Sequence, residues 1–268
     1  MKRLFLLFAV MLCIQGSVHV QAHDFEVDGI YYNIIGEKAV EVTFKGSYIL
    51  NEDYGSTVVI PASVTYDDVT YTVTTIGEYA FLKCRYTKSI TIPNSITTIK
   101  SSAFAYCTRL KEIIIPNSVT SIEAGAFSNC WSLSSVILVD GITSISDGLF
   151  SGCRNLKSIE IPESVTAIGI NAFGRCTCLT SVTIPQSVTS IGNQAFYGCT
   201  SLVDINLPQG ITTIGTGFFE DCKSLSSVVL PDKLITIGRN AFSGAGITSI
   251  IIPESVDSIG TYAFYRCI

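Results

Sequence analysis

Cysteine is the residue type in this sequence whose spacing could support chemistry. The chain of 268 residues contains 10 Cys. Seven of them follow one another at intervals of 23 residues: Cys84, Cys107, Cys130, Cys153, Cys176, Cys199 and Cys222. Thiols at this density could form disulfides, bind a metal ion, or remain buried as small hydrophobic side chains.

Buried thiols are the interpretation that we favour. Equivalent Cys on neighbouring parallel strands would lie about 4.8 Å apart, within reach of a disulfide, but they would point in the same direction. Ala245 occupies the same position one repeat later, so the position accepts a small apolar side chain. Disulfides between some repeats remain an alternative, and Cys178 is expected to be a surface thiol. Metal binding is disfavoured because the two His, His19 and His23, both lie at the N-terminus.

The other polar residues do not form a catalytic set. Serine is abundant, but no His is placed to act as its base. The carboxylate pairs Asp67–Asp68 and Glu220–Asp221 are expected to solvate loops. The sequence has no glycine-rich phosphate loop or calcium-binding loop. We therefore predict that the chain is not an enzyme and that it uses no cofactor.

The elements that hold the cysteines form a sequence repeat. Phe recurs every 23 residues from Phe81 to Phe242, and Phe264 follows after 22. All 8 Pro occupy one position of the repeat. The unit reads Cys-x-x-Leu-x-Ser-Ile-x-Ile-Pro-x-Ser-Val-Thr-x-Ile-Gly-x-x-Ala-Phe. Such a unit cannot bury its own apolar side, whereas stacked units share one core, so the repeat predicts a solenoid.

Each unit has a predicted local structure. Apolar and polar residues alternate over 181–184, which is typical of a half-buried strand, and Pro185 ends that strand. Val188 and Ile191 are expected to point inward on the return path, and Gly192 to form a tight corner. Residues 193–199 are predicted to form about one helical turn. The expected fold is an α/β solenoid of about nine 23-residue units with an N-terminal β cap.

These motifs resemble the BspA-like branch of the leucine-rich repeats. The likeness rests on the spacing from Leu156 to Pro162, on the motif from Ile191 to Cys199, and on the lead-in from Phe25 to Tyr32. It covers about residues 24–268. The resemblance implies a leucine-rich-repeat fold and a role at bacterial surfaces, in adhesion to host matrix proteins or in co-aggregation, as in Bacteroidetes of the gut and mouth.

The two ends of the chain differ from the repeats. Residues 1–22 combine Lys2 and Arg3 with an apolar run and a small residue at Ala22, which is the pattern of a cleaved secretory signal peptide. Residues 23–56 alternate like strands and are predicted to form the β cap. Residues 57–268 contain the repeats, with about nine extra residues around 66–71. The last unit ends soon after Cys267, and we expect it to be incomplete.

The net charge limits the possible partners, and the distribution of apolar residues limits the possible location. The formal net charge of -5 disfavours a nucleic-acid partner, which would require a basic surface. Beyond residue 22 no apolar stretch is long enough to span a bilayer, so we predict no transmembrane segment in the mature chain. The protein is expected to be secreted or held at the cell surface.

Two surfaces are candidates for binding. The outward strand position includes Ile114 and Ile137, then Glu160, and later Val229 and Ile251. Grouped exposed apolar residues often mark contact sites, although ordinary β-propensity explains them equally simply. The second candidate is a basic edge, formed in the first repeats by Lys83, Arg85, Lys88, Arg109 and Lys111. It could meet an anionic partner, or it could serve solubility alone.

Trp131, the one tryptophan, lies beside Cys130 and is either a contact residue or packed on the predicted helical edge. The favoured function is protein–protein recognition or adhesion by an exported leucine-rich-repeat protein. Its partner would be a protein or glycan on host or neighbouring cells. The alternatives are a scaffold module of a larger surface assembly and the recognition part of a longer protein.

Overall fold

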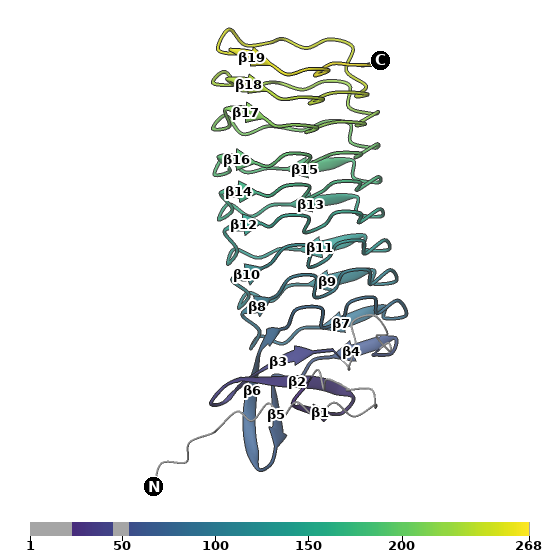
Figure 1. Cartoon of the computed structure of the whole chain (residues 1–268), viewed down its shortest axis with the longest axis vertical. Coiled ribbons are helices and arrows are strands. Elements are labelled where there is room, and N and C mark those ends of the chain that lie inside the picture. Colours follow the sequence, from purple (N-terminus) through teal and green to yellow (C-terminus); the bar gives the residue numbers. More distant parts are fainter. Residues whose placement is uncertain (1–22, 45–53, 268) are drawn as a thin grey trace, which may run out of the picture.

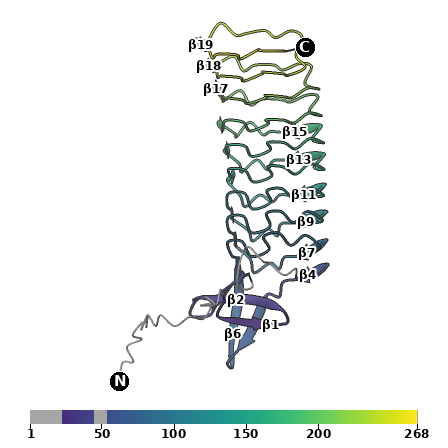
Figure 2. The ribbon, with the colours of Figure 1, turned by 45° about the vertical axis from the view of Figure 1, so that its right-hand side comes forward.

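The computed structural model describes residues 23–44 and 54–267, which stack into a long β-solenoid (Figure 1). The solenoid has about eight turns of about 23 residues each. The predicted signal peptide, residues 1–22, lies outside the described residues. Successive turns lie directly above one another along the whole length, and a second view shows the same stacking (Figure 2).

One strand column lies just before the prolines, where the alternating pattern predicts it. Its strands are β4 (Thr57–Val59), β7 (Ser89–Thr91), β9 (Glu112–Ile114), β11 (Ser135–Ile137), β13 (Ser158–Glu160) and β15 (Ser181–Thr183). They pair in parallel as β4 with β7, β9 with β11, and β13 with β15. In each strand the middle residue is buried and the last one is exposed, as alternation requires.

A second strand column lies on the return path, where the sequence indicated only inward-facing residues. It contains β8 (Thr98–Ile99), β10 (Ser121–Ile122), β12 (Ser144–Ile145), β14 (Ala167–Ile168), β16 (Ser190–Ile191), β17 (Thr213–Ile214), β18 (Thr236–Ile237) and β19 (Ser258–Ile259). These two-residue strands pair in parallel with their neighbours, for example β14 with β16. Val188 is fully buried, while Ile191 is only partly buried.

The N-terminal segment joins this second column. The strands β1 (Phe25–Val27), β2 (Ile30–Gly36) and β3 (Ala39–Thr43) pair antiparallel in sequence. The third of them, β3, then pairs in parallel with β6 (Val69–Ile76), which pairs with β8. The role of residues 23–56 as a cap stays a prediction.

The extra residues of the first unit form a β-hairpin. The strand β5 (Ser63–Tyr66) pairs antiparallel with β6, and Asp67 and Asp68 form the turn with φ angles of 47° and 59°. Two positive φ values in a two-residue loop are the mark of a type I′ hairpin turn. This hairpin interrupts the first of the nine predicted units, and it projects from the end of the solenoid (Figure 1).

The predicted helical turn is wrong, and with it the α/β class: the structure contains no helix within residues 23–44 and 54–267. The segment around Phe196 forms two successive turns, closed by hydrogen bonds from Tyr197 N to Gln194 O and from Cys199 N to Phe196 O. Gln194 and Gly198 have φ angles of 59° and 68°. Residues with positive φ interrupt a right-handed helix, and the same two positions are positive in every repeat from Tyr79 onward.

The repeat glycine also has a different role from the predicted one. A Cβ atom on Gly192 would lie 2.5 Å from the backbone nitrogen of Ile170 in the preceding repeat. Gly192 therefore allows the backbones of two repeats to approach closely, and its φ is not positive.

The left-handed positions lead to a stability prediction. Gln194 has a φ of 59°, whereas the equivalent residues Gly148 and Gly217 are glycines with the same φ. A left-handed backbone conformation costs a non-glycine residue about 1–2 kcal/mol. A change to glycine removes this cost, but it adds about 0.5–1 kcal/mol because glycine loses more conformational entropy on folding. Gln194→Gly is expected to raise the free energy of unfolding by up to about 1 kcal/mol, measured by urea denaturation. Thr189→Gly, outside these positions, should lower it, and equal effects of the two changes would contradict the argument.

The core contains a stack of nine phenylalanines, one from each repeat of the sequence. The rings of Phe81, Phe104 and Phe127 lie parallel, with centroids 5.2 and 5.1 Å apart. The stack continues through Phe150, Phe173, Phe196, Phe219, Phe242 and Phe264, with no separation above 5.8 Å. From Phe81 to Phe242 each ring is fully buried. The rings hold the turns in register because each contacts both neighbours.

Candidate binding surfaces

The cysteine column is a buried structural feature. All seven thiols from Cys84 to Cys222 are fully buried as free cysteines. Six of them donate a hydrogen bond to the carbonyl oxygen of a phenylalanine 26 residues earlier, for example from Cys107 Sγ to Phe81 O at 3.1 Å. The thiol thus satisfies a backbone acceptor that an alanine at the same position could not reach.

Burial also suppresses the reactivity of five of these thiols. It raises the pKa of Cys176 to about 12, and it raises the pKa of Cys107, Cys153, Cys199 and Cys222 well above the ordinary value. The thiolate is the form that attacks and binds metals, so a raised pKa suppresses both reactions. Across the described ranges, His, Cys, Asp and Glu do not gather in groups of three that could hold a metal ion. Cys178 is exposed, as expected.

Ile114 and Ile137 form a continuous apolar step on the outer face of the first strand column. They are directly opposite each other in the parallel pairing of β9 with β11, and 66% and 56% of their surfaces are exposed. Glu160 follows on β13, where its partner is Thr183. The step therefore ends at a charged residue.

Val229 and Ile251 are the most exposed apolar residues of the same column, at 76% and 88%. Together with Ser227, Asp232 and Pro253 they line an open groove of about 430 Å³. The two turns that form it lie next to each other near the C-terminal end of the described chain (Figure 1). The sequence analysis correctly placed these two residues next to each other on the outer face, but it did not predict the groove.

The predicted basic residues also lie on one side of the solenoid. Arg85, Lys88, Arg109 and Lys111 are exposed, and Lys83 is partly buried. Arg154, further along the same edge, is exposed as well. One residue that belongs with them was missed: Tyr86, whose ring centroid lies 5.2 Å from the guanidinium carbon of Arg109. The 23-residue spacing from Tyr86 to Arg109 was the signal that could have identified this pair.

Trp131 lies in the same region, but against turns and not against a helix. Its side chain is 42% exposed, and the guanidinium carbon of Arg154 lies 5.0 Å from its ring centroid. Trp131 and Arg154 are again 23 residues apart. The tryptophan is thus stacked by an arginine of the next turn while its remaining surface faces solvent.

These features define a class of protein. A β-solenoid of 23-residue turns with an isoleucine- and leucine-rich core is a leucine-rich-repeat scaffold, a fold that typically serves binding. The model of the BspA type leucine rich repeat region matches residues 61–176 and 143–268, with six copies. The chain belongs to this family.

Two solved structures with TM-scores above 0.5 share the fold, and a third similar one has a lower TM-score. The T. pallidum leucine-rich-repeat protein TpLRR is 24% identical, with a TM-score of 0.52, and the match covers 91% of this chain and 90% of that one. The pneumococcal vaccine antigen PcpA is 21% identical, with a TM-score of 0.60 and coverages of 91% and 79%. A leucine-rich-repeat protein from Bacteroides ovatus is 26% identical, with a TM-score of 0.37 and coverages of 92% and 93%. No curated protein matches the chain. Among the residues that the structure describes, no helix has the length and apolar character to cross a membrane.

Proposed function

We propose that this protein is exported to the cell surface, where it recognises other proteins through the outer face of its first strand column. Export is supported by the signal-peptide pattern of residues 1–22. Recognition is supported above all by the step of Ile114 and Ile137, because two aligned and mostly exposed isoleucines have no packing role in the solenoid.

The geometry of this face suits a protein partner. Apolar side chains that project from adjacent parallel strands form a rigid ridge, and a rigid ridge loses little conformational entropy when it is buried by a partner. Val229 and Ile251 add a second apolar site with a groove between them. Matrix proteins or proteins of neighbouring cells are the proposed partners, and adhesion is the proposed outcome.

The test replaces the two isoleucines by a residue that the column already accepts. Thr91 and Thr183 occupy the equivalent position in other turns, so Ile114→Thr with Ile137→Thr should fold normally. Binding to immobilised extracellular-matrix proteins and to whole cells is expected to weaken at least tenfold, which corresponds to about 1.4 kcal/mol. Surface biosensor titrations measure this change.

The control removes an exposed apolar residue outside the step. Val203 is 51% exposed, and Thr180 occupies the equivalent position one turn earlier, so Val203→Thr should leave the affinity unchanged. Undiminished binding of the double variant, or absence of any partner for the folded wild-type protein, would contradict the proposed recognition role.

A further inference from the structure

One side of the solenoid concentrates positive charge in spite of the acidic composition of the chain. We call it the basic face, and it consists of Lys83, Arg85, Lys88, Arg109, Lys111, Arg154, Lys157 and Arg175. The segments that form it, residues 83–88, 106–112, 129–135, 152–158 and 175–181, contain one acidic residue, Glu112. Seven of the eight basic side chains are exposed.

Within residues 23–44 and 54–267, these charges are not neutralised by ion pairs. In the described part of the chain none of the eight forms an ion pair with a carboxylate, whereas Lys100, on another side, contacts Glu41 at 2.7 Å. Counter-charges are available, since the sequence has 22 Asp and Glu against 17 Lys and Arg. The carboxylates among the described residues nevertheless leave the basic face unpaired.

Backbone hydrogen bonds align part of the basic face along the solenoid axis. The amide of Lys111 donates to the carbonyl oxygen of Lys88 at 3.4 Å, and the amide of Ser134 donates to that of Lys111 at 2.8 Å. Lys88, Lys111, Ser134 and Lys157 therefore occupy one column at successive turns. Like charges on adjacent strands repel each other, and an anionic ligand lying along the column would relieve that repulsion.

The aromatic residues hold the arginines in place. Arg109 stacks on Tyr86 of the preceding turn, and Arg154 stacks on Trp131. A guanidinium held against a ring loses less freedom on binding, and its planar fork matches sulfate and carboxylate groups.

We propose that the basic face binds a linear anionic polysaccharide that lies along the solenoid axis, with its sulfate or carboxylate groups against successive turns. Successive turns pair as hydrogen-bonded parallel strands, so they repeat about every 4.8 Å. Successive pyranose units of a polysaccharide are spaced by about 5 Å, whereas in an extended acidic peptide the side chains that face one side are spaced by about 6.7 Å. The turn spacing therefore fits the polysaccharide better. The proposal does not depend on the apolar step.

The test measures the binding of a heparin octasaccharide, which has sulfate and carboxylate groups, by titration calorimetry. Lys88→Ser with Lys111→Ser introduces the residue that Ser134 already provides in this column, and binding is expected to weaken at least tenfold. Ser134→Lys completes the column between Lys111 and Lys157, and binding is expected to tighten severalfold. A loss-of-function and a gain-of-function variant together exclude a folding defect as the cause.

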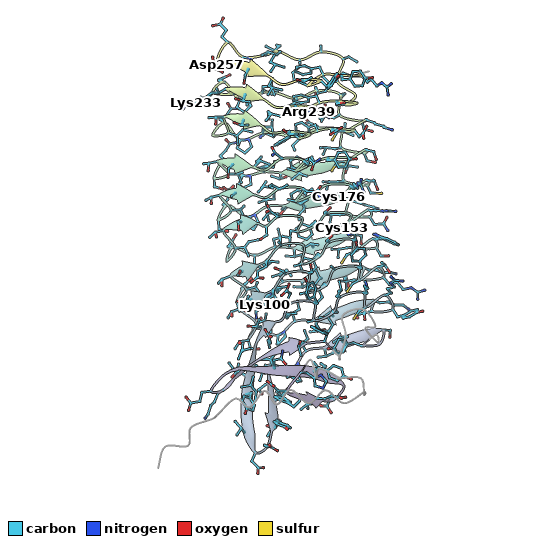
Figure 3. All side chains as sticks on the ribbon, viewed as in Figure 1. Lys100, Cys153, Cys176, Lys233, Arg239 and Asp257 are labelled. Carbon is cyan, nitrogen blue, oxygen red and sulfur yellow. The ribbon has the colours of Figure 1, made fainter. Side chains whose placement is uncertain are left out.

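The matched control is Lys233→Ser, which makes the same change of charge at an exposed lysine on the side of the solenoid away from Cys153 and Cys176 (Figure 3). It should leave the affinity unchanged. Hyaluronan oligosaccharides, whose only anionic groups are carboxylates, show which anionic group the basic face recognises. Binding of heparin but not of hyaluronan would mean that sulfate is recognised, and binding of both would mean that either group is accepted.

Three results would overturn the proposal. One is the absence of binding to both glycans, and another is an equal effect of the Lys233 control and the double variant. The third is tighter binding of poly-glutamate or poly-deoxythymidine than of the octasaccharide at matched charge, which would instead assign an acidic peptide or a nucleic acid to the basic face.

Discussion

The protein is expected to lose stability steeply once the pH rises above about 9, because its buried thiols must then ionise on unfolding. Burial is the main cause that raises the pKa of Cys107, Cys153, Cys176, Cys199 and Cys222 in the folded chain. For Cys176 the folded value is about 12. In the unfolded chain the same thiols ionise near their ordinary pKa of about 8.5.

The sign follows from proton binding in the two states. A group with a raised folded pKa contributes its full stability below the unfolded pKa, and that stability is lost as the pH rises toward the folded pKa. Between pH 9 and 12 the folded Cys176 holds a proton that the unfolded chain has released, so this thiol lowers the free energy of unfolding by about 1.4 kcal/mol per pH unit. The other four thiols, whose pKa is also raised by burial, add to the loss in the same direction.

Urea denaturation at pH 7, 9, 10 and 11 measures this slope. Tyr32 is also buried with a raised pKa and adds to the loss in the same direction, so the thiol share is isolated by mutation. Cys176→Ala should reduce the slope by about 1.4 kcal/mol per pH unit, at some cost in stability at pH 7, and the double variant with Cys153→Ala should reduce the slope further. The residue at position 245 is already alanine, which supports a folded variant.

The control for this experiment is the exposed thiol of Cys178. Its replacement by alanine should leave the slope unchanged, because an exposed thiol has the same environment in both states. Parallel stability curves for the wild-type protein and the double variant above pH 9 would show that the buried thiols are not responsible.

The repeat made much of the fold predictable. Because identical residues recur at fixed spacing, one unit predicted the first strand column, the buried Phe and Cys positions and the exposed Ile114 and Ile137. The basic residues were also assigned to one edge, although their stacking on Tyr86 and Trp131 was not seen. That stacking depends on side-chain reach between turns, which the pattern within a single unit does not include.

The failures have a local physical cause. The length and composition of residues 193–199 are compatible with a helical turn and also with two tight turns. Contacts with the next repeat determine which of the two forms. The amide of Gln194 donates to the carbonyl oxygen of Thr216, and the amide of Phe196 to that of Phe218. Hydrogen bonds between turns of the solenoid thus replace those within a helix. Gly148 and Gly217, which are equivalent to Gln194 in other repeats, were the sequence signal that could have indicated tight turns at this point.

The same stacking makes the centre of the phenylalanine column the most sensitive position for stability. Phe173 is fully buried, and its ring is 5.7 Å from Phe150 and 5.5 Å from Phe196. Phe173→Ala is expected to lower the free energy of unfolding by about 3–5 kcal/mol, because it leaves a cavity and removes two stacking contacts.

The position of the change along the stack should decide its size. In a solenoid each turn is stabilised by its two neighbours, so a weakened central turn uncouples both halves. Phe264 is only partly buried, and it stacks on Phe242 at 5.3 Å, so Phe264→Ala should cost less than half as much. Urea denaturation of both variants makes the comparison, with Tyr265→Ala as the exposed aromatic control. Equal losses for Phe173 and Phe264 would mean that each ring is stabilised by its own turn alone, and that the stack does not couple the turns.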